Sequence, residues 1–290
     1  MPRAYRLATV ALAAFAVPLQ AQSSPNTTKF EAVGTPGYVD STTQTDDVKF
    51  RNDRYERMTV PVHLSGEGPY RFLVDTGADR TAISRQVANR LGLKSKKTAR
   101  LHSITGATSV DTARVPVLRL STKTVHEIDA PLLEEDNIGA DGILGVDSLR
   151  SQRVLFDFKE QTLSIVPARK LAREEAEGAI VVRGRLKNGR LVVTDASADN
   201  TRLSVVLDTG AQYSVGNGAL QRALLKRRLV KMTQDVELVS VTGEKAVGRL
   251  GFVRALEMGG VTMKGLYIAF TDAPMSSTLS GRPPFLALLT

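Results

Sequence analysis

Two short stretches decide the fold: Phe72-Leu-Val-Asp-Thr-Gly-Ala-Asp-Arg-Thr81 and Val205-Val-Leu-Asp-Thr-Gly-Ala-Gln-Tyr-Ser214. Each has three apolar residues, then Asp-Thr-Gly-Ala, and then a hydroxyl side chain six positions after the Asp. The two aspartates, Asp75 and Asp208, are 208 − 75 = 133 residues apart. One such stretch alone is weak evidence of a functional site, because turns with Asp and Gly are common in β proteins. Two copies in equivalent places indicate an internal repeat.

The segments around the two stretches follow the same order. Alternating apolar residues predict strands, and a capping residue before an apolar stripe predicts a short helix. In the first half we expect strands over 58–64 and 70–74 and a helix over 84–91. In the second half we expect strands over 191–194 and 203–207 and a helix over 218–229. The fold class is therefore mainly β, with two homologous lobes that form a pseudo-dimer within one chain around a central cleft.

Composition along the chain suggests five parts. A basic start, an apolar run over 7–17 and a small-residue end predict a secretory signal peptide over residues 1–21, so we expect a periplasmic or secreted protein. Residues 22–55 are polar and turn-rich and predict a flexible leader, and the charged residues 169–178 predict a linker. The N-terminal lobe then covers residues 56–168 and the C-terminal lobe residues 179–290.

Several classes of protein and site are disfavoured by the composition. The chain has no cysteine, which excludes disulfides and a thiol nucleophile. Its three histidines lack the spacing of metal ligands, so we predict neither a metal nor a cofactor. The net charge of +9 is scattered in short runs that follow helix-like stretches, so we expect no nucleic-acid partner. No apolar stretch is long enough for a membrane span.

The repeat carries its own chemistry. An Asp at the end of a buried strand is costly unless its charge is hydrogen-bonded or used, and the Gly two positions later lets backbone N–H groups turn toward it. If two related lobes pack about a pseudo-twofold axis, Asp75 and Asp208 meet at the centre and share a proton. One carboxyl is then a general base and the other a general acid for hydrolysis by water.

At these residues the sequence resembles the retropepsin-like aspartic peptidases, in particular the single-chain bacterial type. The resemblance covers roughly residues 56–290 and implies two β-barrel lobes, an extended peptide or protein substrate, and Asp75 and Asp208 as the catalytic pair. It also implies that Thr76 and Thr209 hydrogen-bond across the lobes and, with Gly77 and Gly210, support the catalytic loops. Asp79 is either a polar group near the substrate or a turn former.

The resemblance further implies a glycine-tipped flap hairpin in each lobe. The tips are expected at Thr105 and Gly106 in the first lobe and at Thr242 and Gly243 in the second, and we expect them to contact the substrate. The segment Asp141-Gly-Ile-Leu-Gly145 matches the strand beneath the first catalytic loop.

The second lobe departs from the family near residue 290. Residues 285–289 can supply the strand beneath the Asp208 loop, but a helix and closing strands comparable to residues 146–166 have no counterpart. We therefore expect an open sheet edge that favours self-association. Two alternatives to an active peptidase stay open: a peptide-binding protein of the same fold with weak or no catalysis, and a basic structural protein of the cell envelope.

Overall fold

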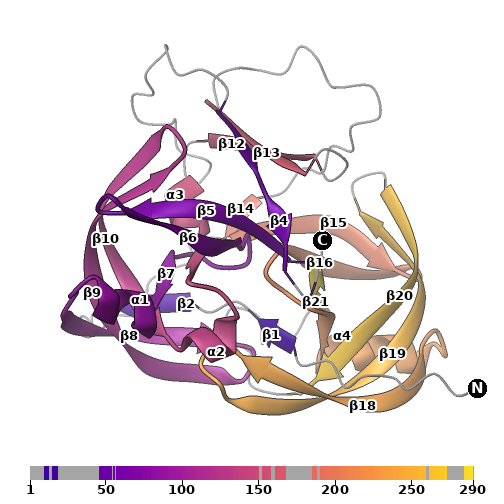
Figure 1. Cartoon of the computed structure of the whole chain (residues 1–290). Helices are drawn as coiled ribbons and strands as arrows, with labels where there is room; N and C mark the ends of the chain where they lie inside the picture. The colour runs from indigo at the N-terminus through magenta and orange to yellow at the C-terminus, as the bar shows by residue number, and fades with distance from the viewer. Residues whose placement is uncertain are drawn as a thin grey trace, which may run out of the picture.

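The computed structural model describes residues 10–12, 15–18, 46–53, 55, 57–149, 152–157, 161–167, 185–187, 190–258, 261–272 and 284–289. Figure 1 shows two rings of strands side by side, the first indigo to magenta and the second orange to yellow. The predicted mainly β fold with two lobes is confirmed. The predicted linker over 169–178 lies outside the described residues.

The first ring has six strands in the hydrogen-bonded order β5, β9, β10, β7, β11, β6, and β6 pairs with β5 to close it. Their bounds are β5 Met58–Leu64, β6 Glu67–Val74, β7 Ala82–Ser84, β9 Gly106–Leu120, β10 Lys123–Leu133 and β11 Gly142–Leu144. The interior is filled by alternating apolar side chains, among them the fully buried Val62, Leu64 and Phe72. Period-two alternation in the sequence therefore becomes the inside and outside of a barrel.

The second ring repeats this order with β15, β19, β20, β17, β21 and β16. Their bounds are β15 Arg190–Ala198, β16 Thr201–Asp208, β17 Ser214–Asn217, β19 Lys245–Met258, β20 Val261–Thr271 and β21 Phe285–Leu289. As expected, β21 lies parallel to β16 beneath the Asp208 loop, with Asp208 opposite Leu289. The ring closes without further strands, so the expected open edge is not found in it.

The closing strands of the first lobe explain this difference. Strands β12 (Gln152–Asp157) and β13 (Thr162–Pro167) form a separate sheet with β3 (Asp46–Lys49), outside the first ring. Because neither ring uses such strands to close, their lack in the described part of the second lobe leaves its ring intact. The short helix α3 (Val146–Leu149) that precedes β12 begins where predicted.

Each ring carries one helix after its short third strand. Helix α1 (Arg85–Arg90) begins after Ser84, whose hydroxyl accepts the Val87 N–H at 3.1 Å. Helix α4 (Gly218–Lys226) begins after Asn217, whose side chain accepts the Leu220 N–H at 2.9 Å. Such side-chain caps satisfy backbone donors at a helix start and are worth about 1 kcal/mol each. A fourth helix, α2 (Glu135–Ile138), lies between β10 and β11.

Two hairpins extend from the rings, and we call them the first and second flap. The first flap is β8 (Ser95–Ser103) with β9 and has its tip at residues 103–107. The second flap is β18 (Lys231–Ser240) with β19 and has its tip at residues 240–244. Strands β8 and β18 belong to the same sheets as the rings but lie outside the closed set of six strands, next to β9 and β19.

Two strands from the predicted signal peptide lie against the outer edges of the flaps. β1 (Val10–Leu12) runs parallel to β18, and β2 (Phe15–Pro18) runs antiparallel to β8. On the opposite side of each sheet, β4 (Arg51–Asn52) lies beside β5 and β14 (Arg185–Lys187) beside β15.

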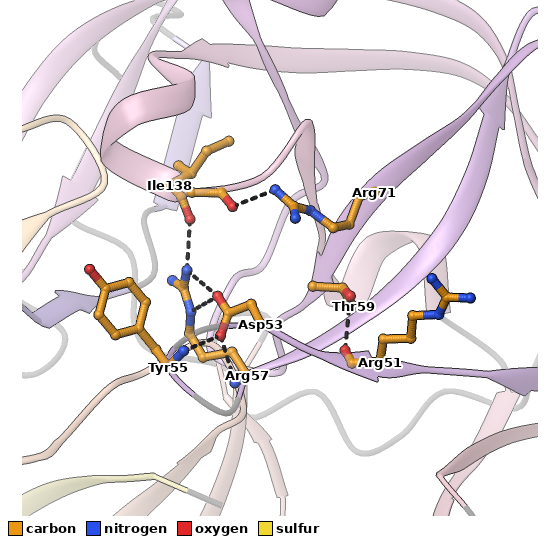
Figure 2. A network of polar contacts seen from close by, with 8 residues as sticks. Arg51, Asp53, Tyr55, Arg57, Thr59, Arg71 and Ile138 are labelled. Atoms are coloured by element: carbon orange, nitrogen blue, oxygen red, sulfur yellow. Dashed lines mark hydrogen bonds and ion pairs between the residues drawn. The ribbon is translucent and has the colours of Figure 1, made fainter.

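The flexible leader predicted over 22–55 is wrong for its last residues, while residues 22–45 lie outside the described part. β3 pairs with β13, and Val48 and Phe50 are buried at 5% and 3% exposure. Figure 2 shows the buried ion pair that follows, in which the Asp53 carboxylate accepts two N–H bonds from the Arg57 guanidinium at 2.7 and 2.9 Å. The polar composition suggested flexibility, but the segment is ordered by its pairing with β13. That strand is more than 100 residues away in the sequence, so the local composition does not reveal it.

The same ion pair fastens α2 to the ring. Arg57 also donates to the Ile138 carbonyl at 2.9 Å, and Arg71 donates to the Gly139 carbonyl at 3.1 Å (Figure 2). Both carbonyls are at the C-terminal end of α2, where cations compensate the helix dipole. Helix α2 is thus held in a fixed position next to β11, the strand beneath the Asp75 loop.

Candidate active site

The first loop begins where β6 ends, with Asp75 buried at 2% exposure. Its backbone N–H donates to the Leu144 carbonyl of β11 at 3.1 Å. One carboxylate oxygen accepts the N–H groups of Gly77 at 2.8 Å and Ala78 at 3.0 Å. The apolar strand and the Gly turn therefore form the anion-accepting loop that the sequence predicted.

The second loop has the same form. Asp208 ends β16, is 2% exposed, and accepts the Gly210 N–H at 3.0 Å. The hydroxyl six positions after each Asp is buried as well, in Thr81 and in Ser214. Repeated sequence thus gives repeated local geometry.

The two carboxyl groups meet at the junction of the lobes. A Cβ atom at Gly77 would lie 2.6 Å from Asp208 Cγ, and one at Gly210 would lie 2.5 Å from Asp75 Cγ. No side chain fits at those distances, so glycine at both positions is a steric requirement of the pair. The predicted supporting role of Gly77 and Gly210 therefore has a structural cause.

The environment of Asp75 favours its protonated form. Burial raises the pKa of Asp75 well above its ordinary value, and the charge of the neighbouring Asp208 raises it further. The N–H bonds from Gly77 and Ala78 oppose this shift without cancelling it. Two adjacent buried carboxyls cannot both be ionised without large cost, so the pair retains one proton over a wide pH range.

The threonines between Asp and Gly lock the loops to each other. Thr76 donates its hydroxyl to the Leu207 carbonyl at 2.8 Å, and Thr209 donates its hydroxyl to the Val74 carbonyl at 2.7 Å. Each hydroxyl also accepts the backbone N–H of the other threonine, at 3.1 and 3.2 Å. The cross-lobe bonds that the resemblance implied for Thr76 and Thr209 are confirmed.

Comparison with known proteins agrees with this geometry. Residues 60–148 match the protein-family model described as aspartyl protease. This match covers most of the first lobe, including the Asp75 loop. A crystal structure of a retropepsin-like aspartic protease from Rickettsia conorii is 20% identical to this chain, with a TM-score of 0.32. The matched region covers 42% of this chain and 91% of the chain in that crystal structure. Among curated proteins, none matches the sequence.

The two flaps are docked, each on the opposite lobe. Ile104 at the first tip is 1% exposed and belongs to an apolar cluster of the second lobe that includes Ala211. Val241 at the second tip is 3% exposed and belongs to a cluster of the first lobe that includes Ala78. Both alanines directly follow an Asp-Thr-Gly loop, so the tips lie close to the two loops.

The predicted tip residues occupy these turns. Gly106 and Gly243 have φ angles of +138° and +87°, a region that favours glycine. Thr105 and Thr242 each form a hydrogen bond with a serine of their own tip. The hairpin prediction is therefore confirmed for the turns, and contact with a substrate stays a prediction.

The structure gives roles to two further residues near the site, Thr81 and Glu244, that the sequence did not predict. Thr81 binds the Asp147 carboxylate through its hydroxyl at 2.7 Å and accepts the Gly145 N–H at 3.1 Å, which fixes the end of the Asp75 loop to α3. The repeated hydroxyl six positions after each Asp was the signal for it. The other is Glu244 at the second flap tip, for which the sequence held no signal. Asp79 is half-buried, and Gln212 stands at its place in the second lobe.

Within the part of the chain that the structure describes, no helix has the length and hydropathy to cross a membrane.

Proposed function

We propose that the chain is an exported aspartic endopeptidase that hydrolyses peptide bonds with water, using Asp75 and Asp208 as a pair that shares one proton. The observation that carries this proposal is the contact of two buried carboxyl groups across the lobes, with the pKa of Asp75 raised by burial and by the charge of Asp208. A structural ion pair would bring opposite charges together, whereas this arrangement keeps two acids together at a cost in stability. Such a cost is typical of catalytic sites.

The reaction follows from the two protonation states. The ionised carboxylate removes a proton from a water molecule, and the oxygen of that water attacks the carbonyl carbon of the peptide. The protonated carboxyl gives its proton to the carbonyl oxygen, which produces a tetrahedral diol. Transfer of a proton to the peptide nitrogen then breaks the C–N bond and releases an amine and a carboxylic acid. The bonds from Thr76 and Thr209 hold the pair in place during these steps.

Extended peptides are the substrates that the flaps would hold best. Strand β18 pairs with β1 and strand β8 with β2 along their outer edges, so these edges can pair with an extended backbone. Peptide binding by strand addition uses the same backbone hydrogen bonds. Removal of residues 1–21 as a signal peptide would free both edges for a substrate.

The test of catalysis compares three aspartate variants in a mixed peptide library from acidic to neutral pH. Asp75→Asn and Asp208→Asn should each lower kcat/KM by roughly 10³-fold or more, and the double variant should be hardly worse than either. Asp272→Asn is the matched control, because Asp272 has an exposed side chain in an ion pair with Arg222. Appreciable turnover in either single variant would overturn the shared-proton pair.

The same experiment separates the alternatives. A protein that only binds peptides should bind them with similar affinity in the wild type and in Asp75→Asn, and neither should turn over. A basic structural protein should bind anionic polymers in a salt-sensitive manner that survives loss of both aspartates.

Export is tested separately by the mass of the protein recovered from a bacterial envelope fraction. Its support is the basic, apolar and small-residue order of residues 1–21. The mature chain should begin at residue 22, and recovery with residue 1 in place would refute this part of the proposal.

A further inference from the structure

The two flap tips have nearly the same sequence and the same internal bonds. Ser103-Ile-Thr-Gly-Ala107 corresponds to Ser240-Val-Thr-Gly-Glu244. In both tips the serine hydroxyl is 2.8 Å from the threonine hydroxyl and accepts the threonine N–H at 3.2 Å. The tips differ in chemistry at one position, where the first has the methyl group of Ala107 and the second has the carboxylate of Glu244.

This carboxylate reaches from the second flap to the first. One oxygen of Glu244 accepts the hydroxyl of Thr108, on β9 of the first flap, at 2.6 Å. The other oxygen is 3.4 Å from the Thr105 hydroxyl of the first flap and accepts hydroxyls of Ser240 and Thr242 in its own tip. Glu244 therefore joins the second flap to the first through Thr108, which lies 136 residues away in the sequence.

The contact has the features of a strong polar interaction. Partial burial alone would raise the pKa of Glu244, but hydrogen bonds from Ser240, Thr108 and Thr242 outweigh it and lower that pKa to about 2. The group is thus ionised at pH values well above 2, and bonds to a charged acceptor are roughly twice as strong as neutral ones. Ser240 is fully buried, and its hydroxyl donates to this carboxylate.

We propose that Glu244 is a positioning residue that latches the first flap to the second in the closed arrangement. It acts through Thr108 and does not touch the reacting carboxyls. Because Ala107 cannot provide the same bond from the other side, the latch is one-sided, although the lobes are related by a pseudo-twofold axis. Substrate entry and product release require the flaps to separate, so this latch sets how often they do so; that consequence for turnover rests on the proposed function.

The decisive variant is Thr108→Val, because it removes the 2.6 Å bond between the flaps, leaves only the long contact of Thr105 at 3.4 Å, and keeps the shape of the side chain. The bonds of Glu244 within its own tip are unaffected, which separates a latch from a residue that only shapes its own turn. Thr108→Ser retains the hydroxyl and is the matched control. Glu244→Gln is a second route to the same effect, since it removes the charge without shortening the side chain, and it carries the test if Thr108→Val does not fold.

The distance between the flaps can be measured without any substrate. The chain has no cysteine, so Ser109→Cys and Val247→Cys would carry spin labels, one on each flap. Both positions are exposed, Val247 at 70%. Double electron–electron resonance on the labelled full chain should give one narrow distance for the wild-type background and for Thr108→Ser.

In Thr108→Val and in Glu244→Gln we expect a second, longer distance, with the ratio of open to closed flaps raised about tenfold, as expected for loss of a hydrogen bond to a charged group. An unchanged, narrow distribution in both variants would overturn the latch. This readout needs no turnover, so its outcome is independent of whether the proposed peptidase activity is found. If the activity is found, Thr108→Val and Glu244→Gln should also change KM, and Thr108→Ser should keep the wild-type KM.

Discussion

Replacement of Thr209 by valine tests whether the two catalytic loops stabilise each other. The Thr209 hydroxyl donates to the Val74 carbonyl at 2.7 Å and accepts the Thr76 N–H at 3.1 Å, and both partners belong to the other lobe. The side chain is 4% exposed, so water does not readily replace it. Valine has the same shape but leaves one acceptor and one donor without this partner.

The expected loss follows from these two groups. A buried polar group left unsatisfied costs about 1–3 kcal/mol. Because Thr76 is only half-buried, we place the total near the lower half of the sum, at about 2–4 kcal/mol. Thr209→Ser keeps the hydroxyl and should lose much less.

Urea denaturation followed by circular dichroism gives the free energy of unfolding of each variant. Thr233→Val is the control. Thr233 is an exposed residue of the second flap, and its hydroxyl donates to the Leu250 carbonyl at 3.2 Å. Exposed substitutions of this kind usually change stability by about 0.5 kcal/mol or less. If Thr209→Val is no more destabilising than Thr233→Val, the cross-lobe bonds do not contribute the stability assigned to them.

Three further predictions concern the pair, the barrel and the first flap. Burial and the charge of Asp208 raise the pKa of Asp75 above its ordinary 3.8, so its contribution to stability is greatest below pH 3.8 and is lost as the pH rises through the folded-state value. Asp75→Asn should therefore gain stability relative to wild type between pH 4 and pH 8 in urea titrations, and an equal gap at both pH values would contradict this. Gly142→Ala would place a Cβ 2.5 Å from Phe72 and should lower the melting temperature more than Gly92→Ala, where nothing lies within 4 Å and the φ of +64° is the source of strain. Gly106→Val should raise KM or lower kcat while the protein stays folded, although valine at a φ of +138° lowers the melting temperature; unchanged kinetics would make Gly106 an ordinary turn residue.

The sequence predicted the parts of this molecule that depend on local pattern. Alternation and capping predicted β5 and α1 to within a residue, since Ser84 caps the helix with its own side chain. The repeated Asp-Thr-Gly predicted which two carboxyls would meet, because a repeat implies equivalent positions about an axis. In each case the signal is a motif of a few adjacent residues, and the repeat consists of two copies of such a motif.

The features that were missed depend on partners distant in the sequence. Order at residues 46–53 requires β13 and the carbonyls of α2, and no composition rule reports such partners. Closure of the second ring depends on β21 fitting between β16 and β17. The role of Glu244 depends on where Thr108 of the other flap lies, and an isolated Glu after Thr-Gly looks like any exposed turn residue.

The opposite directions of β1 and β2 relative to the flaps bear on how a peptide is oriented. These strands are successive parts of one segment, yet one is parallel to β18 and the other antiparallel to β8. A peptide bound in reverse would exchange the two pairings and would still form one parallel and one antiparallel ladder. Backbone pairing therefore gives no preference between the two directions of travel from N-terminus to C-terminus. The direction in which a peptide binds would then depend on positions where the two lobes carry different side chains, and Asp79 and Gln212 are one such pair.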